Sequence, residues 1–268
     1  MAQQTDGSPG GRLEVQGAVA RVIFDNPRAR NGLTGRSAAL VAELIRKADA
    51  DPAVRVIIIT GAGQHFCSGA DLREGPKELA GGAEAIRRHV SEHFHGLVRA
   101  IAECETPNMA VIRGACVGFG FDLMLHCDLR LCATTSKFGQ VFKRIGLVPD
   151  GGSSYMLPRV IGLGRAMELM LLAETFDGAR ALELGLVNRC IPDSELDALA
   201  EDWAQRLAQG PPIAYRLGRR NLRLSGQGGL EQALEREVES QVTCLTSKDM
   251  LRGVQAFFGK KTPQFKGD

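Results

Sequence analysis

A nearly continuous run of branched apolar residues, Val54–Thr60 (VRVIIIT), constrains the fold of this chain most strongly. Such a run is typical of a strand that is buried on both faces of a parallel sheet. It leads directly into the turn Gly61-Ala62-Gly63, and the strand expected at Met109–Arg113 leads in the same way into the glycine-rich segment Gly114–Gly120. Short strands that alternate with helical patterns indicate an α/β fold.

The pattern divides the chain into three parts. Residues 1–12 are polar, lack the features of a signal peptide and are expected to be disordered. Residues 13–192 form the α/β core, and residues 193–268 carry only helical patterns. The other expected elements are strands at Leu13–Val15, Val19–Phe24 and Leu129–Ala133, a helix capped by Thr34, helices over Glu84–Glu103, Ser153–Val160 and Arg165–Leu172, and a loop over Ser136–Gly152.

Composition excludes several classes of protein. A formal net charge of +2 gives no reason to expect nucleic acid or an anionic membrane as a partner. No apolar run approaches the ~20 residues of a membrane helix. The seven cysteines include no C-x-x-C pair, which favours buried, reduced thiols in a cytoplasmic protein. His89 and His93 have no evident third ligand, so no metal site is expected.

The glycine-rich turns do not fit the common nucleotide or hydrolase motifs. Gly61-x-Gly63 and Gly118-x-Gly120 both lack the third glycine of a dinucleotide fingerprint, and no Walker lysine follows either. No serine lies in a G-x-S-x-G elbow. The turns therefore serve another chemistry.

Two motifs resemble those of the crotonase (enoyl-CoA hydratase/isomerase) superfamily. They are GAGQHFCSGADL, residues 61–72, and GACVGFGFDLMLHCD, residues 114–128. The active-site pattern is most similar to isomerases of the phenylacetate-pathway type. The resemblance covers nearly all of the chain after residue 12, and it continues in family order through Asn26-Pro27, Arg30–Leu33, Lys137–Gly139, Gly146–Gly152, Leu157–Arg159, Gly185–Val187 and Phe257–Phe265.

This resemblance implies a spiral core of ββα units with a helical C-terminal oligomerisation segment. It also implies an acyl-CoA thioester substrate, so coenzyme A enters with the substrate and no separate cofactor is expected. Members assemble as trimers or dimers of trimers, and Glu231–Leu245 would supply part of that surface.

The two turns are expected to stabilise a thioester enolate. By resemblance, the donors to the thioester oxygen are the backbone N–H groups of Ala70 and Phe119. One fixed donor of this kind contributes about 3–4 kcal/mol in other enzymes. Glycines at positions 69, 118 and 120 would let the backbone approach the thioester.

The acidic residues point away from simple hydration. Family hydratases use two glutamates, and Asp122 and Phe142 stand at those positions here. Asp122 is also compatible with a plain role in a first helical turn. Asp150 matches the aspartate that moves a proton along the acyl chain in isomerases, although it could instead cap a helix or form a turn.

Other readings stay open on sequence alone. One is a hydratase that uses Asp122 and Asp150. Another follows the aryl-CoA dehalogenases, in which a histidine stands at the position of His95, and uses Asp150 and His95 in nucleophilic chemistry on an aryl or β-dicarbonyl substrate. A non-catalytic binding protein is the third. The residues expected to bind substrate are Arg28, Arg30, Ser68, Gly69, Asp71, Leu72, Gly118, Gly120, Phe142, Lys260 and Lys261.

Overall fold

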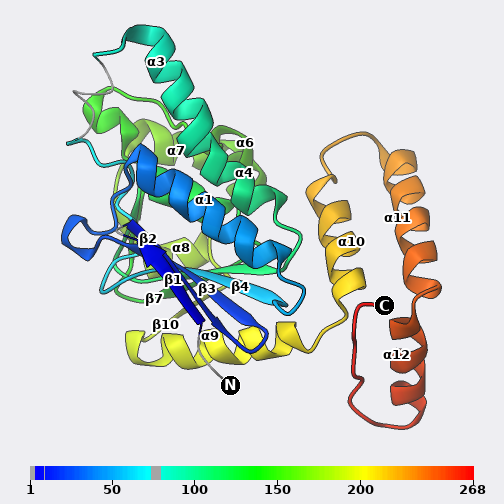
Figure 1. Ribbon diagram of the computed structural model, residues 1–268. Coiled ribbons are helices and arrows are strands. Elements are labelled where there is room, and N and C mark those ends of the chain that lie inside the picture. Colours follow the sequence, from blue (N-terminus) through cyan, green and yellow to red (C-terminus); the bar gives the residue numbers. More distant parts are fainter. Residues whose placement is uncertain (1–3, 9, 74–79) are drawn as a thin grey trace.

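The computed structural model describes residues 4–8, 10–73 and 80–268, and a seven-stranded sheet forms its centre (Figure 1). The first three strands are antiparallel to one another, and each strand from the third onward is parallel to the next. Across the sheet the order is β1 (Gln4–Ser8), β2 (Gly10–Gln16), β3 (Val19–Asp25), β4 (Val56–Gly61), β5 (Asn108–Ile112), β7 (Leu129–Ala133) and β10 (Arg189–Ile191).

A second sheet of three strands completes the predicted spiral. It consists of β6 (Ala115–Val117), β8 (Lys137–Gly139) and β9 (Phe176–Asp177). The chain passes from β5 to β6 and from β7 to β8. Each of these two pairs adds one strand to the large sheet and one to the small sheet before a helix follows. The expectation of ββα units in an α/β fold is confirmed.

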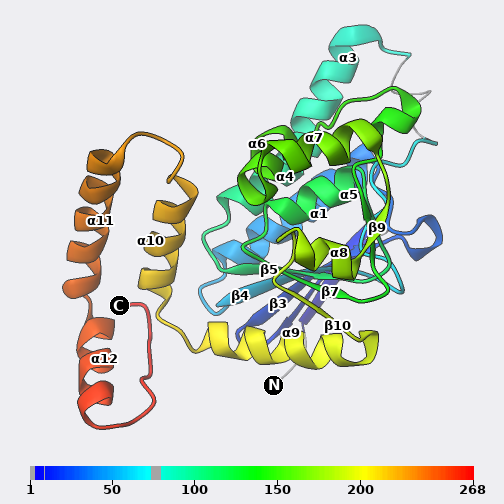
Figure 2. The ribbon, with the colours of Figure 1, turned by 180° about the vertical axis from the view of Figure 1, so that it is seen from behind.

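The helices cover both faces of the large sheet (Figures 1 and 2). The core helices are α1 (Gly35–Ala50), α3 (Gly82–His89), α4 (His95–Glu103), α5 (Phe119–Leu125), α6 (Ser153–Ile161), α7 (Leu163–Leu172), α8 (Gly178–Glu183) and α9 (Asp193–Ala208). Short 3-10 helices span Pro27–Ala29 and Phe142–Ile145. As predicted, Thr34 caps α1, and its hydroxyl accepts a hydrogen bond of 3.1 Å from the Ser37 N–H.

Strand β4 shows how the apolar run is used. Ile57 and Ile59 pack into a cluster with α1 on one face, whereas Val56 and Ile58 pack against α9 on the other. Successive side chains of a strand point to opposite faces, so a strand covered on both sides must be apolar throughout. Because β4 is held on both faces, the position of its carboxyl end, where the turn at Gly61 begins, is fixed.

The N-terminal expectation is wrong in part. Gln4–Ser8 forms β1 and pairs with β2, which begins at Gly10, so much of the segment 1–12 is ordered in strands. An edge strand needs backbone hydrogen bonds on one side only, so a polar sequence does not prevent it.

Three other boundaries differ from expectation. The predicted loop 136–152 contains β8 and a 3-10 helix, because Lys137–Gly139 pairs with β6. The helix expected over 84–103 is interrupted by a π-helical turn, Val90–Phe94. Helix α9 lies on the large sheet, so the segment that stands apart begins one helix later than residue 193.

That segment is an arm of three helices, α10 (Pro212–Arg223), α11 (Leu230–Leu245) and α12 (Lys248–Phe258), which extends away from the core (Figure 1). Asp128 links it to the core: its carboxylate forms an ion pair with Arg219, whose Nε lies 2.7 Å from Oδ2, and accepts a hydrogen bond from Arg223 Nη2 at 2.8 Å. Of the helices in the described residues, none has the length and apolar character to cross a membrane.

Candidate active site

The first glycine turn is held against the loop that follows β3. The Ser68 N–H donates to the Arg30 carbonyl at 3.0 Å, the Leu33 N–H donates to the Gly69 carbonyl at 2.8 Å, and the Asp71 N–H donates to the Leu33 carbonyl at 2.7 Å. Ala70 lies between these ties, and its N–H has no acceptor within residues 4–8, 10–73 and 80–268.

The second turn lies directly beside the first. The Val117 N–H donates to the Cys67 carbonyl at 3.2 Å, and the Cys67 N–H donates to the Ala115 carbonyl at 3.0 Å. The chain then enters α5 through Gly118, whose φ of 54° belongs to the left-handed region that favours glycine. The first peptide N–H of α5 is that of Phe119.

Close approach of the two turns explains two of the glycines. A Cβ on Gly69 would lie 3.2 Å from the Phe119 nitrogen, and one on Gly120 would lie 2.4 Å from the Cys67 carbonyl oxygen. Gly69 also has a φ of 93°. The Phe119 N–H, like that of Ala70, finds no acceptor within the described part of the chain. The structure thus brings together two unsatisfied donors, as an oxyanion site requires.

Asp150 lies in the turn before α6. Its Oδ1 is buried and has no hydrogen-bond partner among the residues described. Burial raises the pKa of Asp150 above its ordinary value, and the neighbouring His95 lowers that pKa in part. A raised pKa suits a carboxyl that must take up and release a proton near neutral pH.

His95 contacts the backbone of Asp150. Its Nε2 lies 2.9 Å from the Asp150 carbonyl oxygen, and since a carbonyl only accepts, Nε2 is the protonated nitrogen in this contact. His95 follows the π-helical turn, whose last residue, Phe94, packs edge-on against Phe119 with ring centroids 4.9 Å apart. Single π-turns inside helices are frequent at functional sites.

Asp122 has different surroundings. It is fully buried, its Oδ2 accepts from the Gly151 N–H at 2.8 Å, and its Oδ1 accepts from Gln140 Nε2 at 2.5 Å. Burial, with a smaller contribution from the charge of Asp150, raises the pKa of Asp122 to about 7, against the opposing effect of Ser153, Gly151 and Gln140. Both carboxyl oxygens are therefore engaged by the protein.

The enoyl-CoA hydratase/isomerase family model matches residues 14–268. The chain belongs to this family. It is 31% identical to the 1,2-epoxyphenylacetyl-CoA isomerase of Escherichia coli over 94% of this chain and 97% of that protein. It is 30% identical to a 4-chlorobenzoyl coenzyme A dehalogenase of Arthrobacter over 86% of this chain and 83% of the relative.

The fold agrees with solved structures of the family. The crystal structure of an enoyl-CoA hydratase from Bacillus anthracis matches with a TM-score of 0.88 and 30% identity, and the match covers 99% of each chain. The resemblance to the crotonase superfamily, predicted from two turn motifs, is confirmed. These relatives include a hydratase, an isomerase and a dehalogenase, so family membership alone leaves the reaction open.

Some predicted substrate contacts are near the two turns of this family member. Arg28 and Arg30 are exposed on the loop that binds the first turn. Asp71 pairs with Arg73, which donates from Nε at 2.8 Å, and Leu72 is 59% exposed. The resemblance also makes Leu72–Gly82 part of the acyl pocket, and residues 74–79 of that segment lie outside the described residues.

Two other predicted contacts are engaged elsewhere. The Ser68 hydroxyl donates to the Ala29 carbonyl at 3.0 Å. Phe142 is buried in the main apolar cluster with an exposed fraction of 9%. Both side chains therefore have structural partners, and Phe142 offers no polar group to a water molecule.

Lys260 and Lys261 are not brought to the turns within one chain. They are exposed and follow α12, which belongs to the arm and lies away from the core in both ribbon views (Figures 1 and 2). A contact between these lysines and substrate would need the site of another copy.

Sequence reasoning missed two residues of this neighbourhood, Gln140 and His126. Gln140 donates to Asp122, and His126 Nε2 lies 2.8 Å from the Gly151 carbonyl oxygen. Gln140 immediately follows the Phe138-Gly139 pair, and His126 stands inside the second motif. Only their position near family motifs could have drawn attention to them.

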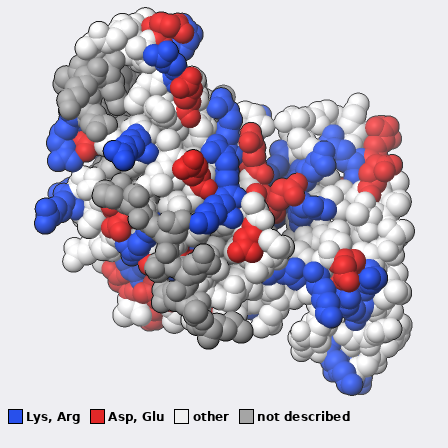
Figure 3. Space-filling view, in the orientation of Figure 1, with Lys and Arg blue, Asp and Glu red and all other residues white. Residues whose placement is uncertain are grey.

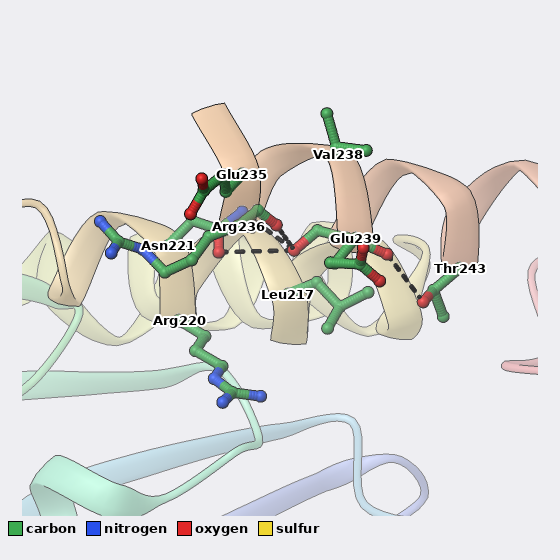
Figure 4. A pocket seen from close by; sticks show the side chains of 9 residues that line it. Leu217, Arg220, Asn221, Glu235, Arg236, Val238, Glu239 and Thr243 are labelled. Carbon is green, nitrogen blue, oxygen red and sulfur yellow. Dashed lines mark hydrogen bonds between the residues drawn. The ribbon is translucent and has the colours of Figure 1, made fainter. Parts of the chain in front are cut away.

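A groove of about 710 Å³ lies between α10 and α11 (Figure 4). Its lining mixes apolar side chains, Leu217 and Val238, with polar and charged ones, and Asn221, Ser240 and Arg236 are joined there by hydrogen bonds. None of its lining residues belongs to the two turns, so the chemistry is not assigned to it.

Neither the surface charges in Figure 3 nor the metal-binding residue types in the described part of the chain point to a second site. On the face in Figure 3, acidic and basic side chains are interspersed rather than gathered into one basic field. Within the described part of the chain, no three His, Cys, Asp or Glu side chains are grouped to hold a metal ion.

Proposed function

We propose that this protein is an enoyl-CoA isomerase-type enzyme in which Asp150 moves a proton along the acyl chain of a CoA thioester. One observation carries the proposal. Asp150 has a buried carboxyl oxygen without a hydrogen-bond partner in the described part of the chain, whereas both carboxyl oxygens of Asp122 accept hydrogen bonds, from Gln140 and Gly151. One carboxyl with free accepting capacity is what a proton shuttle needs.

The proposed reaction uses the two turns and Asp150 together. The Asp150 carboxylate removes a proton from one carbon of the acyl chain, and the electron pair of that C–H bond moves through the conjugated system to the thioester oxygen. The N–H groups of Ala70 and Phe119 stabilise the resulting enolate. The protonated Asp150 then returns the proton to a different carbon, and the thioester carbonyl re-forms with the double bond shifted.

Hydration is the weaker reading of the same site. Adding water across a double bond needs groups that hold the water and move its protons. Asp122 is fully buried with both oxygens occupied, and Phe142 is apolar and buried. We therefore expect hydration of crotonyl-CoA to be negligible.

The proximity of His95 and Asp150 supports a second candidate, in which an Asp150 carboxylate oxygen displaces an anionic leaving group, such as a halide, from the ring of an aryl-CoA and forms an aryl ester. On a β-dicarbonyl substrate the same oxygen would attack a carbonyl carbon and form a mixed anhydride, as the C–C bond breaks and its electron pair leaves as an enolate that is then protonated. The 30% identity to a dehalogenase that acts on 4-chlorobenzoyl coenzyme A adds to it. The contact of His95 Nε2 with the Asp150 carbonyl weighs against it, since that nitrogen is already engaged.

A product assay tests the proposal. The purified protein is incubated with 2-enoyl-, 3-enoyl- and aryl-CoA thioesters, and products are identified by mass spectrometry and NMR. A double-bond shift without change of mass, lost in Asp150→Asn and kept in the exposed control Asp202→Asn, is expected. A gain of about 18 mass units, which is one water, or a covalent adduct trapped on Asp150, would instead favour hydration or aspartyl attack.

We also propose that the protein works in the cytoplasm as a homotrimer or dimer of trimers, with CoA entering as part of the substrate. Exposed apolar side chains on α11 support the assembly, because they are unusual on a monomer and follow helical spacing. They are Leu230, Leu234, Val238, Val242 and Leu245. In such an assembly Lys260 and Lys261 of one copy would meet the CoA of another.

A further inference from the structure

Helix α5 carries contacts to both halves of the proposed site. Its first residue, Phe119, supplies one oxyanion donor, and Asp122 in its first turn reaches the Asp150 turn. His126, directly after the helix, reaches the same turn. One helix thus carries the Phe119 N–H and is hydrogen-bonded to the turn that holds Asp150, two groups that must keep a fixed distance during proton transfer.

The contact from Asp122 leaves almost no free space. A Cβ on Gly151 would lie 2.5 Å from Asp122 Cβ and 3.0 Å from Phe119 Cδ2, so the Asp150 turn is pressed against α5. The Gly151 N–H donates to Asp122 at 2.8 Å inside a fully buried environment. Breaking a buried hydrogen bond of this kind is costly, so the contact fixes the turn.

The contact from His126 holds the next peptide. Burial lowers the pKa of His126, so the ring is neutral at pH 7 and donates from Nε2 to the Gly151 carbonyl at 2.8 Å. A Cβ on Gly152 would lie 2.8 Å from that same Nε2, and the φ of Gly152 is 82°. This backbone geometry favours glycine and keeps the turn close to the ring.

The backbone around Asp150 is therefore fixed by hydrogen bonds, whereas Oδ1 of its carboxyl group is not. The Asp150 carbonyl faces His95, the Gly151 N–H faces Asp122 and the Gly151 carbonyl faces His126. Asp150 Oδ1 has no partner in the described part of the chain. We propose that Asp122 and His126 are positioning residues, which set the Asp150 carboxyl relative to the oxyanion donor on α5 and do not themselves exchange protons with substrate.

This inference rests on the proposed function of Asp150, and it predicts a distinctive response to conservative change. In Asp122→Asn the amide oxygen can still accept from Gly151, and a rotated Gln140 can accept from the amide nitrogen, because Gln140 Oε1 is buried without a partner. Asp122→Ala removes both contacts. We expect Asp122→Ala to lower kcat by about 10–100-fold. The kcat of Asp122→Asn should be at least about tenfold higher than that of Asp122→Ala, and KM should change little in either variant.

The decisive measurement is a double-mutant cycle on turnover of the best substrate, with CoA affinity measured in parallel. If Asp122 acts only through Asp150, Asp122→Ala combined with Asp150→Asn is no slower than Asp150→Asn alone. The inference is overturned if the losses multiply, or if Asp122→Asn is as slow as Asp122→Ala, since both results make Asp122 an acid or base in its own right.

A second variant protects the test from a failure of Asp122→Ala to fold. His126→Phe keeps an aromatic ring and removes the donor to Gly151, and it is expected to lower kcat by about 5–20-fold without additional loss in the Asp150→Asn background. A loss in that background would contradict the positioning role. Wild-type turnover in Asp150→Asn itself would refute the proposed function, which is a different and separately visible result.

Discussion

The two glycine turns are packed and hydrogen-bonded within the chain, whereas the C-terminal arm exposes apolar side chains. A Cβ on Gly120 would clash with the Cys67 carbonyl oxygen at 2.4 Å, one on Gly69 would be crowded at 3.1 Å, and the loops are held by hydrogen bonds within the chain. On α11 and α12, apolar side chains such as Val238, Phe257 and Phe258 are 58–79% exposed. The turns proposed to hold the thioester are thus fixed by contacts within one chain, whereas the arm presents an apolar surface that one chain leaves uncovered.

This contrast predicts which changes abolish the reaction and which only weaken it. Substitutions in the turns should act on kcat, because they move donors or remove the base. Substitutions in the arm should act on assembly and on the affinity for CoA. Four variants break or sharpen the contrast, from the largest expected effect to the smallest.

Asp150→Asn should have the largest effect. It keeps the size of the side chain but removes the base, so kcat is expected to fall by about 10²–10⁴-fold, the usual contribution of such a group. The Kd for CoA, measured by calorimetry, should stay within about twofold because the variant does not touch the loop at Arg28 and Arg30. Wild-type turnover would transfer the role to another residue.

Gly69→Ala should come next. Its φ of 93° strains any other residue, and the added Cβ would lie 3.2 Å from the Phe119 nitrogen. A displaced oxyanion donor costs about 10²–10³-fold in kcat. The matched control is Gly164→Ala on α7, where the new Cβ meets nothing within 4 Å, and kcat should not change. Equal kcat in Gly69→Ala and wild type would contradict the oxyanion assignment.

Val238→Glu should separate the arm from the turns. A charge in the exposed apolar row of α11 is expected to leave a monomer of 28.8 kDa by light scattering. If Lys260 and Lys261 serve a neighbouring copy, KM should rise by about 3–10-fold, as expected for lost phosphate contacts. Gln241→Glu, on the same helix, provides the charge control. A monomeric wild type, or an unchanged assembly in Val238→Glu, would rule out this role for α11.

The smallest effect concerns pH and Asp122. Burial raises the pKa of Asp122 to about 7, so the unfolded chain loses this proton at lower pH than the folded chain does. The contribution of Asp122 to the free energy of unfolding therefore falls as pH rises from about 4 to about 7. Asp122→Asn cannot ionise. The Tm of this variant relative to wild type should therefore increase between pH 5 and pH 8, by on the order of a few degrees. A constant difference would contradict the raised pKa.

The sequence by itself determined the local features. The branched apolar run predicts β4, Thr34 predicts the start of α1, and the glycines predict the two turns, because each depends on backbone freedom or on side-chain pattern within a few residues. The ordered motifs also identified the family. Polar composition misled at the N-terminus, where β1 is ordered by pairing with β2, and local pattern missed β8, which is ordered by pairing with β6.

Only the tertiary structure decided how the carboxyls differ. Asp122 and Gly151 are 29 positions apart, and His95 and Asp150 are 55 apart, so no local pattern records their hydrogen bonds. The same holds for the burial of Phe142 and for the packing of α9 on the sheet. A carboxyl acquires its pKa and its free lone pairs from whatever the fold places around it, and those partners are chosen by long-range packing rather than by neighbours in sequence.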